Sequence, residues 1–139
     1  MPSPDELDDL IAQVLERFEI YRPPVPVEMM LSRPLEGLWD PVDPTQMSGI
    51  LFSMRQRYAP RMSSARLLAR HICGSSWGEA RGLSEILIDV DAVNAFARAL
   101  IMPRDFVQQM ASAGRNPTTI SIAFEVPEED ARLRLLDLV

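Results

Sequence analysis

Residues 61–73 read Arg-Met-Ser-Ser-Ala-Arg-Leu-Leu-Ala-Arg-His-Ile-Cys, and we expect the rest of the chain to be organised around this segment. At helical spacing the segment carries one apolar stripe, formed by Met62, Ala65, Leu68, Ala69, Ile72 and Cys73. Leu67 falls on the opposite side, where a surface helix is normally polar, so the pattern indicates a helix covered on both sides. Arg66 and Arg70 lie beside the stripe, one helical turn apart. Two guanidinium groups on a central helix require a structural or functional reason.

The composition is typical of a soluble single domain that spans residues 1–139. The chain is 47% hydrophobic and 24% charged, and its length suffices to bury a core without disulfides. Its net charge of −6 disfavours general nucleic-acid binding, because phosphate neutralisation needs a basic surface. No stretch approaches the roughly 20 apolar residues of a membrane span, and the N-terminus lacks a signal-peptide pattern. A single cysteine excludes an internal disulfide, so we expect a cytoplasmic protein.

Helix and turn signals precede the central segment. Ser3-Pro4-Asp5-Glu6 predicts a capping box that starts a helix running to about Ile20. A short helix is expected at residues 26–31. The prolines within residues 33–44 predict turns and short edge strands. Residues 49–52, Gly-Ile-Leu-Phe, are the best strand candidate, although a run this short does not exclude helix.

Helical patterns continue after the central segment. An amphipathic helix is predicted over residues 89–102, with Asp89 or Asp91 as its N-cap. Pro103 ends this helix and can start another, and residues 118–124 and 127–138 predict two closing helices. The expected fold class is therefore α+β and mostly helical, with a small β-sheet beside the central helix.

Two segments of the chain share their residue pattern with a known helix pair. Residues 61–65 read Arg-Met-Ser-Ser-Ala, and residues 92–103 read Ala-Val-Asn-Ala-Phe-Ala-Arg-Ala-Leu-Ile-Met-Pro. Together they resemble the ImmA/IrrE metallopeptidase family, in which Arg-Phe-Thr-x-Ala leads into His-Glu-x-Gly-His and a later helix reads close to Glu-Ala-Asn-x-Phe-Ala-x-x-Leu-Leu-Met-Pro. Weaker matches at residues 24–28, 48–51 and 123–133 follow in the family's order. The resemblance implies a zincin-like helix pair and a bacterial or phage origin.

The family's catalytic positions are occupied by residues without the required chemistry. On this register Arg66 and Arg70 replace the two histidine ligands, Leu67 replaces the general base, and Ala92 replaces the third ligand. Arginine offers only donors and stays protonated, and leucine cannot accept a proton. We therefore predict no metal, no cofactor and no peptidase activity.

The resemblance also implies a partner, because members of the family act on helix-turn-helix repressors of the Xre type. We predict a catalytically inactive pseudoenzyme that binds such a repressor, or a related partner, as a regulatory module. One alternative is a metal-dependent hydrolase whose ligands have moved to His71 and the acids between Glu79 and Asp91. Another is a small transcription regulator that uses the closing helices, although the acidic run Glu128 to Asp130 argues against contact with phosphates.

The candidate binding residues are Arg66, Arg70, His71, Asp91 and Asn94. The two arginines can pair with Glu85, Asp89 or Asp91, can bind an anionic ligand or acidic partner segment, or can extend into solvent. We favour the ion pair, because a buried guanidinium without a partner is costly. His71 is interpreted as an ordinary surface histidine, and Cys73 as a buried, inert thiol.

Overall fold

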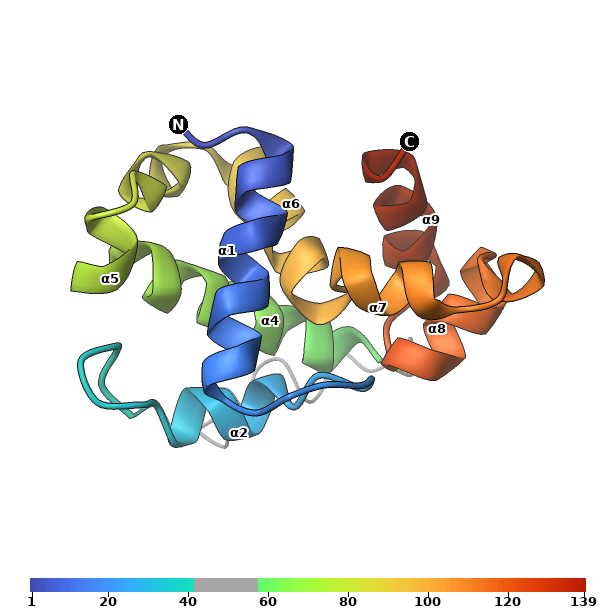
Figure 1. The fold of residues 1–139 in the computed structure, drawn as a ribbon, viewed down its shortest axis with the longest axis horizontal. Helices are drawn as coiled ribbons and strands as arrows, with labels where there is room; N and C mark the ends of the chain where they lie inside the picture. Colours follow the sequence, from blue (N-terminus) through green and yellow to red (C-terminus); the bar gives the residue numbers. More distant parts are fainter. Residues whose placement is uncertain (42–57) are drawn as a thin grey trace.

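Helices make up all the regular structure of residues 1–41 and 58–139, which are the residues that the computed structural model describes (Figure 1). In chain order they are α1 (Pro4–Arg17), α2 (Val27–Ser32), α4 (Ala59–Gly74), α5 (Ser76–Glu79), the 3-10 helix η2 (Leu83–Ile88), α6 (Val90–Ile101), α7 (Arg104–Gln109), the 3-10 helix η3 (Ser112–Gly114), α8 (Pro117–Phe124) and α9 (Glu128–Asp137). Within these ranges no helix has the length and apolar character needed to span a membrane.

The expected α+β class, with a small β-sheet beside the central helix, is wrong. The described residues contain no strand, and the fold is a helical bundle. Residues 33–41, where turns and short edge strands were expected, contain turns and no strand, and Gly37 adopts a left-handed conformation at φ +84°. Prolines cannot donate to a ladder, and a strand needs a partner to satisfy its backbone groups. The strand candidate at residues 49–52 lies outside the described residues.

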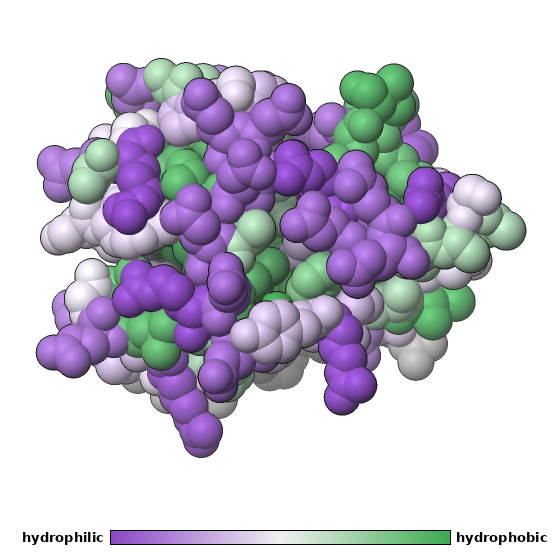
Figure 2. Space-filling view, in the orientation of Figure 1, coloured by the Kyte–Doolittle hydropathy of each residue, from purple (hydrophilic) through white to green (hydrophobic). Residues whose placement is uncertain are grey.

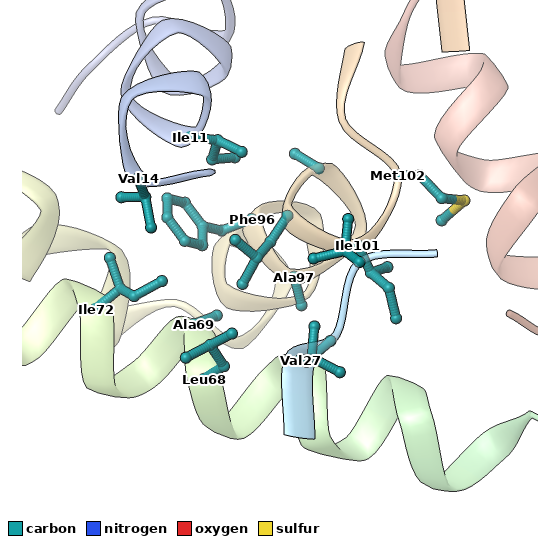
Figure 3. Close-up of a cluster of buried hydrophobic side chains, with 14 of the residues drawn as sticks. Ile11, Val14, Val27, Leu68, Ala69, Ile72, Phe96, Ala97, Ile101 and Met102 are labelled. Atoms are coloured by element: carbon teal, nitrogen blue, oxygen red, sulfur yellow. The ribbon is translucent and has the colours of Figure 1, made fainter. Parts of the chain in front are cut away.

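The core is built where α4 packs against α6, with α1 and α2 covering the pair (Figure 3). Leu68, Ala69 and Ile72 of α4 face Phe96 and its neighbours on α6, and all of these side chains are buried. The predicted apolar stripe of α4 is thereby confirmed. Small side chains such as Ala69 let helices approach closely, since the distance between packed helices depends on the residues at the contact. Each buried large apolar side chain contributes about 1.5–3 kcal/mol.

Capping determines where two of the helices begin. Ser3 Oγ accepts from the Glu6 amide at 3.2 Å, and Glu6 Oε2 accepts from the Ser3 amide at 2.9 Å, so the predicted capping box is confirmed. The helix ends at Arg17, earlier than expected, and Glu19 adopts a left-handed conformation at φ +58°. Asp89 caps α6 by accepting from the Asp91 amide at 2.9 Å, as predicted.

Arg61 in the first turn of α4 joins three parts of the bundle. Its Nη1 donates to Glu28 Oε2 of α2 at 3.0 Å, and its Nη2 donates to the Val25 carbonyl at 2.8 Å. Its Nε donates to the carbonyl of Glu125 at 3.0 Å, directly after α8. One guanidinium thus binds a carboxylate and backbone carbonyls on both sides of α4.

A second arginine, Arg134 of α9, is buried with only 3% of its surface exposed. Its Nε donates to the Met102 carbonyl at the end of α6, and its Nη2 donates to Asp8 Oδ1 of α1, both at 2.9 Å. Burial lowers the pKa of Arg134, whereas Asp8 opposes that effect. This side chain fixes α9 to the other end of the core.

Candidate functional site

The four residues that the resemblance aligns with catalytic positions lie on α4 and α6, the two helices that pack most extensively against each other. Leu67 and Ala92 are half-buried and pack against the hydrophobic core. Arg66 is half-buried, and Arg70 is exposed. The apolar replacements are therefore part of the packing, while the charged replacements lie at the edge of the helix pair.

The predicted ion pair between α4 and the approach to α6 is wrong. Within residues 1–41 and 58–139, neither Arg66 nor Arg70 forms a hydrogen bond or ion pair. The acids proposed as partners were Glu85, Asp89 and Asp91. The first pairs with the N-terminal amino group at 2.7 Å, the second caps α6, and the third is exposed. These acids stabilise chain ends and helix starts, and so do not compensate the arginines.

Arg66 instead interacts at longer range with Asp130, a half-buried residue in the first turn of α9. Burial raises the pKa of Asp130, and Glu129 raises it further, while the positive charges of Arg66 and Arg98 lower it. Helices α4, α6 and α9 therefore each bring a charged group to this junction. The charge of Arg66 is therefore compensated by Asp130 on α9, and not by an acid on the approach to α6.

A polar pocket of about 350 Å³ opens at the C-terminal end of α4. Its lining consists of Leu38, Trp39, Asp40, Arg70, His71, Gly74, Ser75 and Ser76. Of the predicted binding residues, the structure brings Arg70 and His71 together here. Arg66, Asp91 and Asn94 do not line this pocket; Asn94 is half-buried on α6.

Two walls of this pocket are fixed by their own hydrogen bonds. Trp39 donates from Nε1 to the Met30 carbonyl at 3.2 Å and stacks on Phe18, with ring centroids 5.8 Å apart. Ser75 donates to the Ile72 carbonyl at 2.7 Å and accepts from the Gly78 amide at 3.1 Å. Arg70, His71 and Asp40 are thus displayed from a preformed frame, which reduces the entropy lost when a ligand binds.

The pocket can form charge-assisted hydrogen bonds of both signs. Arg70 can hold a carboxylate in a bidentate pair, His71 can donate or accept, and the exposed Asp40 can accept from a cationic or amide group. Cys73 of α4 does not line the pocket; it is fully buried, and burial raises the pKa of its thiol to about 12. The interpretation of Cys73 as a buried thiol is confirmed, and its protonated state makes it a poor nucleophile.

The relocated metal site that we considered as an alternative would need His71 together with the acids from Glu79 to Asp91. In the part of the chain that the structure describes, no three His, Cys, Asp or Glu side chains are grouped so that they could hold a metal ion. His71 faces a pocket whose acid is Asp40.

Sequence reasoning missed Asp40 and Trp39 of the pocket, and Asp130 at the junction of three helices. The first two lie in a proline-punctuated segment that has no periodic pattern, so nothing local marks them as site residues. Asp130 was considered only as part of an acidic helix start. A charged residue at the start of a helix interacts with charges on other helices when they pack against it, and only the tertiary arrangement shows this.

Comparison of the chain with protein-family models, with curated proteins and with solved structures finds no match in any of the three.

Proposed function

We propose that this chain is a catalytically inactive ImmA/IrrE-like domain that works as a protein-binding regulatory module. The observation that carries this proposal is the set of residues at the four catalytic positions of the resemblance: Arg66, Leu67, Arg70 and Ala92. None of them can ligate zinc or accept a proton from water. Leu67 and Ala92 also pack against the core, which supports their role in stability.

The surface that remains suits the recognition of a polar protein segment. Arg70, His71 and Asp40 border one pocket with fixed walls, and Arg70 forms no bond with any residue in ranges 1–41 and 58–139. A partner segment with an acidic side chain next to a donor group would complement all three. From the resemblance, the partner is a helix-turn-helix repressor of the Xre type or a related regulator.

The test is to incubate the purified chain with an Xre-type helix-turn-helix repressor, with added zinc, and to measure complex formation and cleavage separately. We expect a complex by isothermal titration calorimetry and an intact repressor by mass spectrometry. The matched control combines Arg66→His, Leu67→Glu, Arg70→His and Ala92→Glu, which should bind zinc because it restores the ligand set of the resemblance. Repressor cleavage by the unmodified chain would overturn the proposal, as would the absence of a complex. A folded fourfold variant that ignores zinc would contradict the register.

The alternative of a DNA-binding regulator depends on the C-terminal helices. Helices α8 and α9 pack together and are joined by three residues, Glu125, Val126 and Pro127. This connection is as short as that of a helix-turn-helix motif. However, Glu128 and Glu129 are exposed in the first turn of α9. Carboxylates at the end of a helix that would enter the major groove repel phosphates, so no DNA-binding function is proposed.

A further inference from the structure

A groove of about 310 Å³ lies between the C-terminal half of α1 and α7, and it shares no residue with the pocket at Arg70. Its lining consists of Ala12, Leu15, Glu16, Ile20, Tyr21, Pro103, Asp105, Phe106 and Gln109. The floor is apolar: Leu15 and Pro103 are buried, and Ile20 and Phe106 are half-buried. Tyr21 at the rim is 65% exposed. Exposed aromatic residues beside apolar depressions are typical anchors of protein interfaces.

Acidic side chains border this groove. Glu16 of α1 and Asp105 of α7 belong to its lining. Asp5 and Asp9 lie outside the lining, but at about 100° per residue they fall on the same side of α1 as Ala12, nearer its N-terminus. Glu16 is exposed and forms no ion pair within residues 1–41 and 58–139. Figure 2 shows hydrophilic residues along α1 and α7 on this face, with hydrophobic residues visible in the hollow between them.

The nearest cation does not cancel this charge. Arg104 of α7 is 2.9 Å from Asp9, 3.9 Å from Asp5 and 3.4 Å from Asp105, so it is already surrounded by carboxylates. Its hydrogen bond to Asp9 raises the pKa of Arg104. Arg17 falls about 100° further round α1 than Glu16, away from the groove. Beyond Tyr21, Arg22 lines an adjoining recess that shares Ile20 and Tyr21 with the groove, and Glu19 lines the same recess. The groove therefore has an apolar floor with an excess of acid around it.

We propose that this groove binds a basic amphipathic helix of a partner protein, with one apolar side chain seated on Leu15, Ile20 and Phe106. Asp9 and Glu16 are seven residues apart on α1, roughly 10 Å or two helical turns. Glu16 forms no ion pair among the described residues, whereas Asp9 already accepts from Arg104, so a basic residue opposite Asp9 joins that ion pair. A helix alongside α1 can place Lys or Arg residues at this spacing, with its apolar anchor facing the floor of the groove. This is the helix-in-groove mode of recognition, in which apolar anchors supply affinity and flanking charges supply orientation.

Charge also favours a basic helix over the other partners that could bind an apolar groove. The chain carries a net charge of −6, so a second copy, a nucleic acid or an anionic membrane surface would be repelled by this face. A basic helix is attracted to it. The inference is independent of the regulatory function proposed above, because it rests on a different surface.

The test uses fluorescein-labelled helical peptides with Lys at positions i and i+7 and Leu, Phe or Trp between them, titrated into the whole chain and followed by anisotropy. A scrambled peptide of the same composition is the control. We expect saturable binding of at least one ordered peptide, weaker binding of the scrambled one, and loss of affinity as salt rises. Amide shifts in NMR spectra should change around Ala12, Tyr21 and Phe106. Equal binding of ordered and scrambled peptides, or shifts elsewhere, would overturn the proposal.

Variants then locate the site. Glu16→Lys should weaken binding roughly tenfold or more, because reversal replaces attraction by repulsion. Glu36→Lys changes the net charge equally at an exposed turn outside the groove and should retain the affinity of the unmodified chain. Ala12→Trp fills the groove and should prevent binding; if it unfolds the chain, Tyr21→Ala at the exposed rim replaces it. Equal losses of peptide affinity in Glu16→Lys and Glu36→Lys would show that only the net charge of the chain matters, and would contradict the proposal. A dimer that Ala12→Trp disperses in sedimentation would assign the groove to a second copy instead.

Discussion

Arg61 and Arg70 occupy one helix, yet their environments are opposite. Arg61 has only 17% of its side chain exposed and donates to Glu28 and to backbone carbonyls before α2 and after α8. Arg70 is exposed beside a pocket and forms no bond within residues 1–41 and 58–139. Arg66, between them, interacts with Asp130 only at longer range. Burial and bonding therefore decide which arginines maintain the fold and which are available to a ligand.

The largest expected effect is the loss of Arg61. Arg61→Ala should lower the free energy of unfolding by about 2–4 kcal/mol, because it removes a partly buried ion pair with Glu28 and the bonds to the carbonyls of Val25 and Glu125. Urea denaturation monitored by circular dichroism measures this. Arg61→Lys should recover only part of the loss, since a single ammonium cannot reproduce the fork that reaches three directions. A change of Arg61→Ala as small as that of Arg70→Ala would remove the distinction between the two arginines.

Much of the bundle could be predicted from the sequence, because its signals are local. The apolar stripe of α4, the capping box before α1 and the N-cap Asp89 each depend on residues a few positions apart. The role of Arg61 depends on acceptors 33 to 64 positions away, and the ion pair of Arg134 on an acid 126 positions away. No periodic pattern encodes such separations. The same applies to the pocket, whose lining combines Asp40 with Arg70 and His71, about 30 residues further along the chain.

The expected β-sheet illustrates a different limit. The prolines of residues 33–44 fit both edge strands and tight turns, since proline lacks the amide hydrogen that a ladder or a helix would use. Residues 33–41 adopt turns, and Trp39 is buried through its bond to Met30 and its stacking on Phe18. The burial of Trp39 therefore favours turns over an edge strand in this segment.

A smaller effect is expected at the junction of Arg66 and Asp130. Burial raises the pKa of Asp130, so the folded protein holds this proton more tightly than the unfolded chain does. The stabilising contribution is full below the ordinary Asp pKa of 3.8 and is lost as the pH rises through the raised folded pKa. Asp130→Asn should therefore raise the unfolding midpoint at neutral pH, and this gain should disappear in acid. A gain that persists unchanged in acid would show that charge is not its cause.

Arg66 sharpens this measurement, because its charge lowers the pKa of Asp130. Arg66→Ala should destabilise the unmodified chain slightly at neutral pH and should have less effect in the Asp130→Asn background. The coupling from a double-mutant cycle should be a few tenths of a kcal/mol and at most about 1 kcal/mol. Arg70→Ala is the matched control, since Arg70 does not contribute to the pKa of Asp130.

The smallest effect on stability, and the largest on partner binding, is expected at Arg70. Arg70→Ala should change the free energy of unfolding by less than about 0.5 kcal/mol, as is usual for an exposed side chain without bonds. If the pocket holds an acidic group of the repressor, the same substitution should weaken the complex roughly tenfold, and Arg70→Lys should restore only part of the affinity because the bidentate fork is lost. Calorimetric titration of the repressor measures the binding, and thermal unfolding checks the fold. Arg132→Ala on α9 is the control, because Arg132 bonds only to Glu129 among residues 1–41 and 58–139. An Arg70→Ala protein that unfolds more easily but binds normally would place Arg70 with Arg61 among the arginines that maintain the fold.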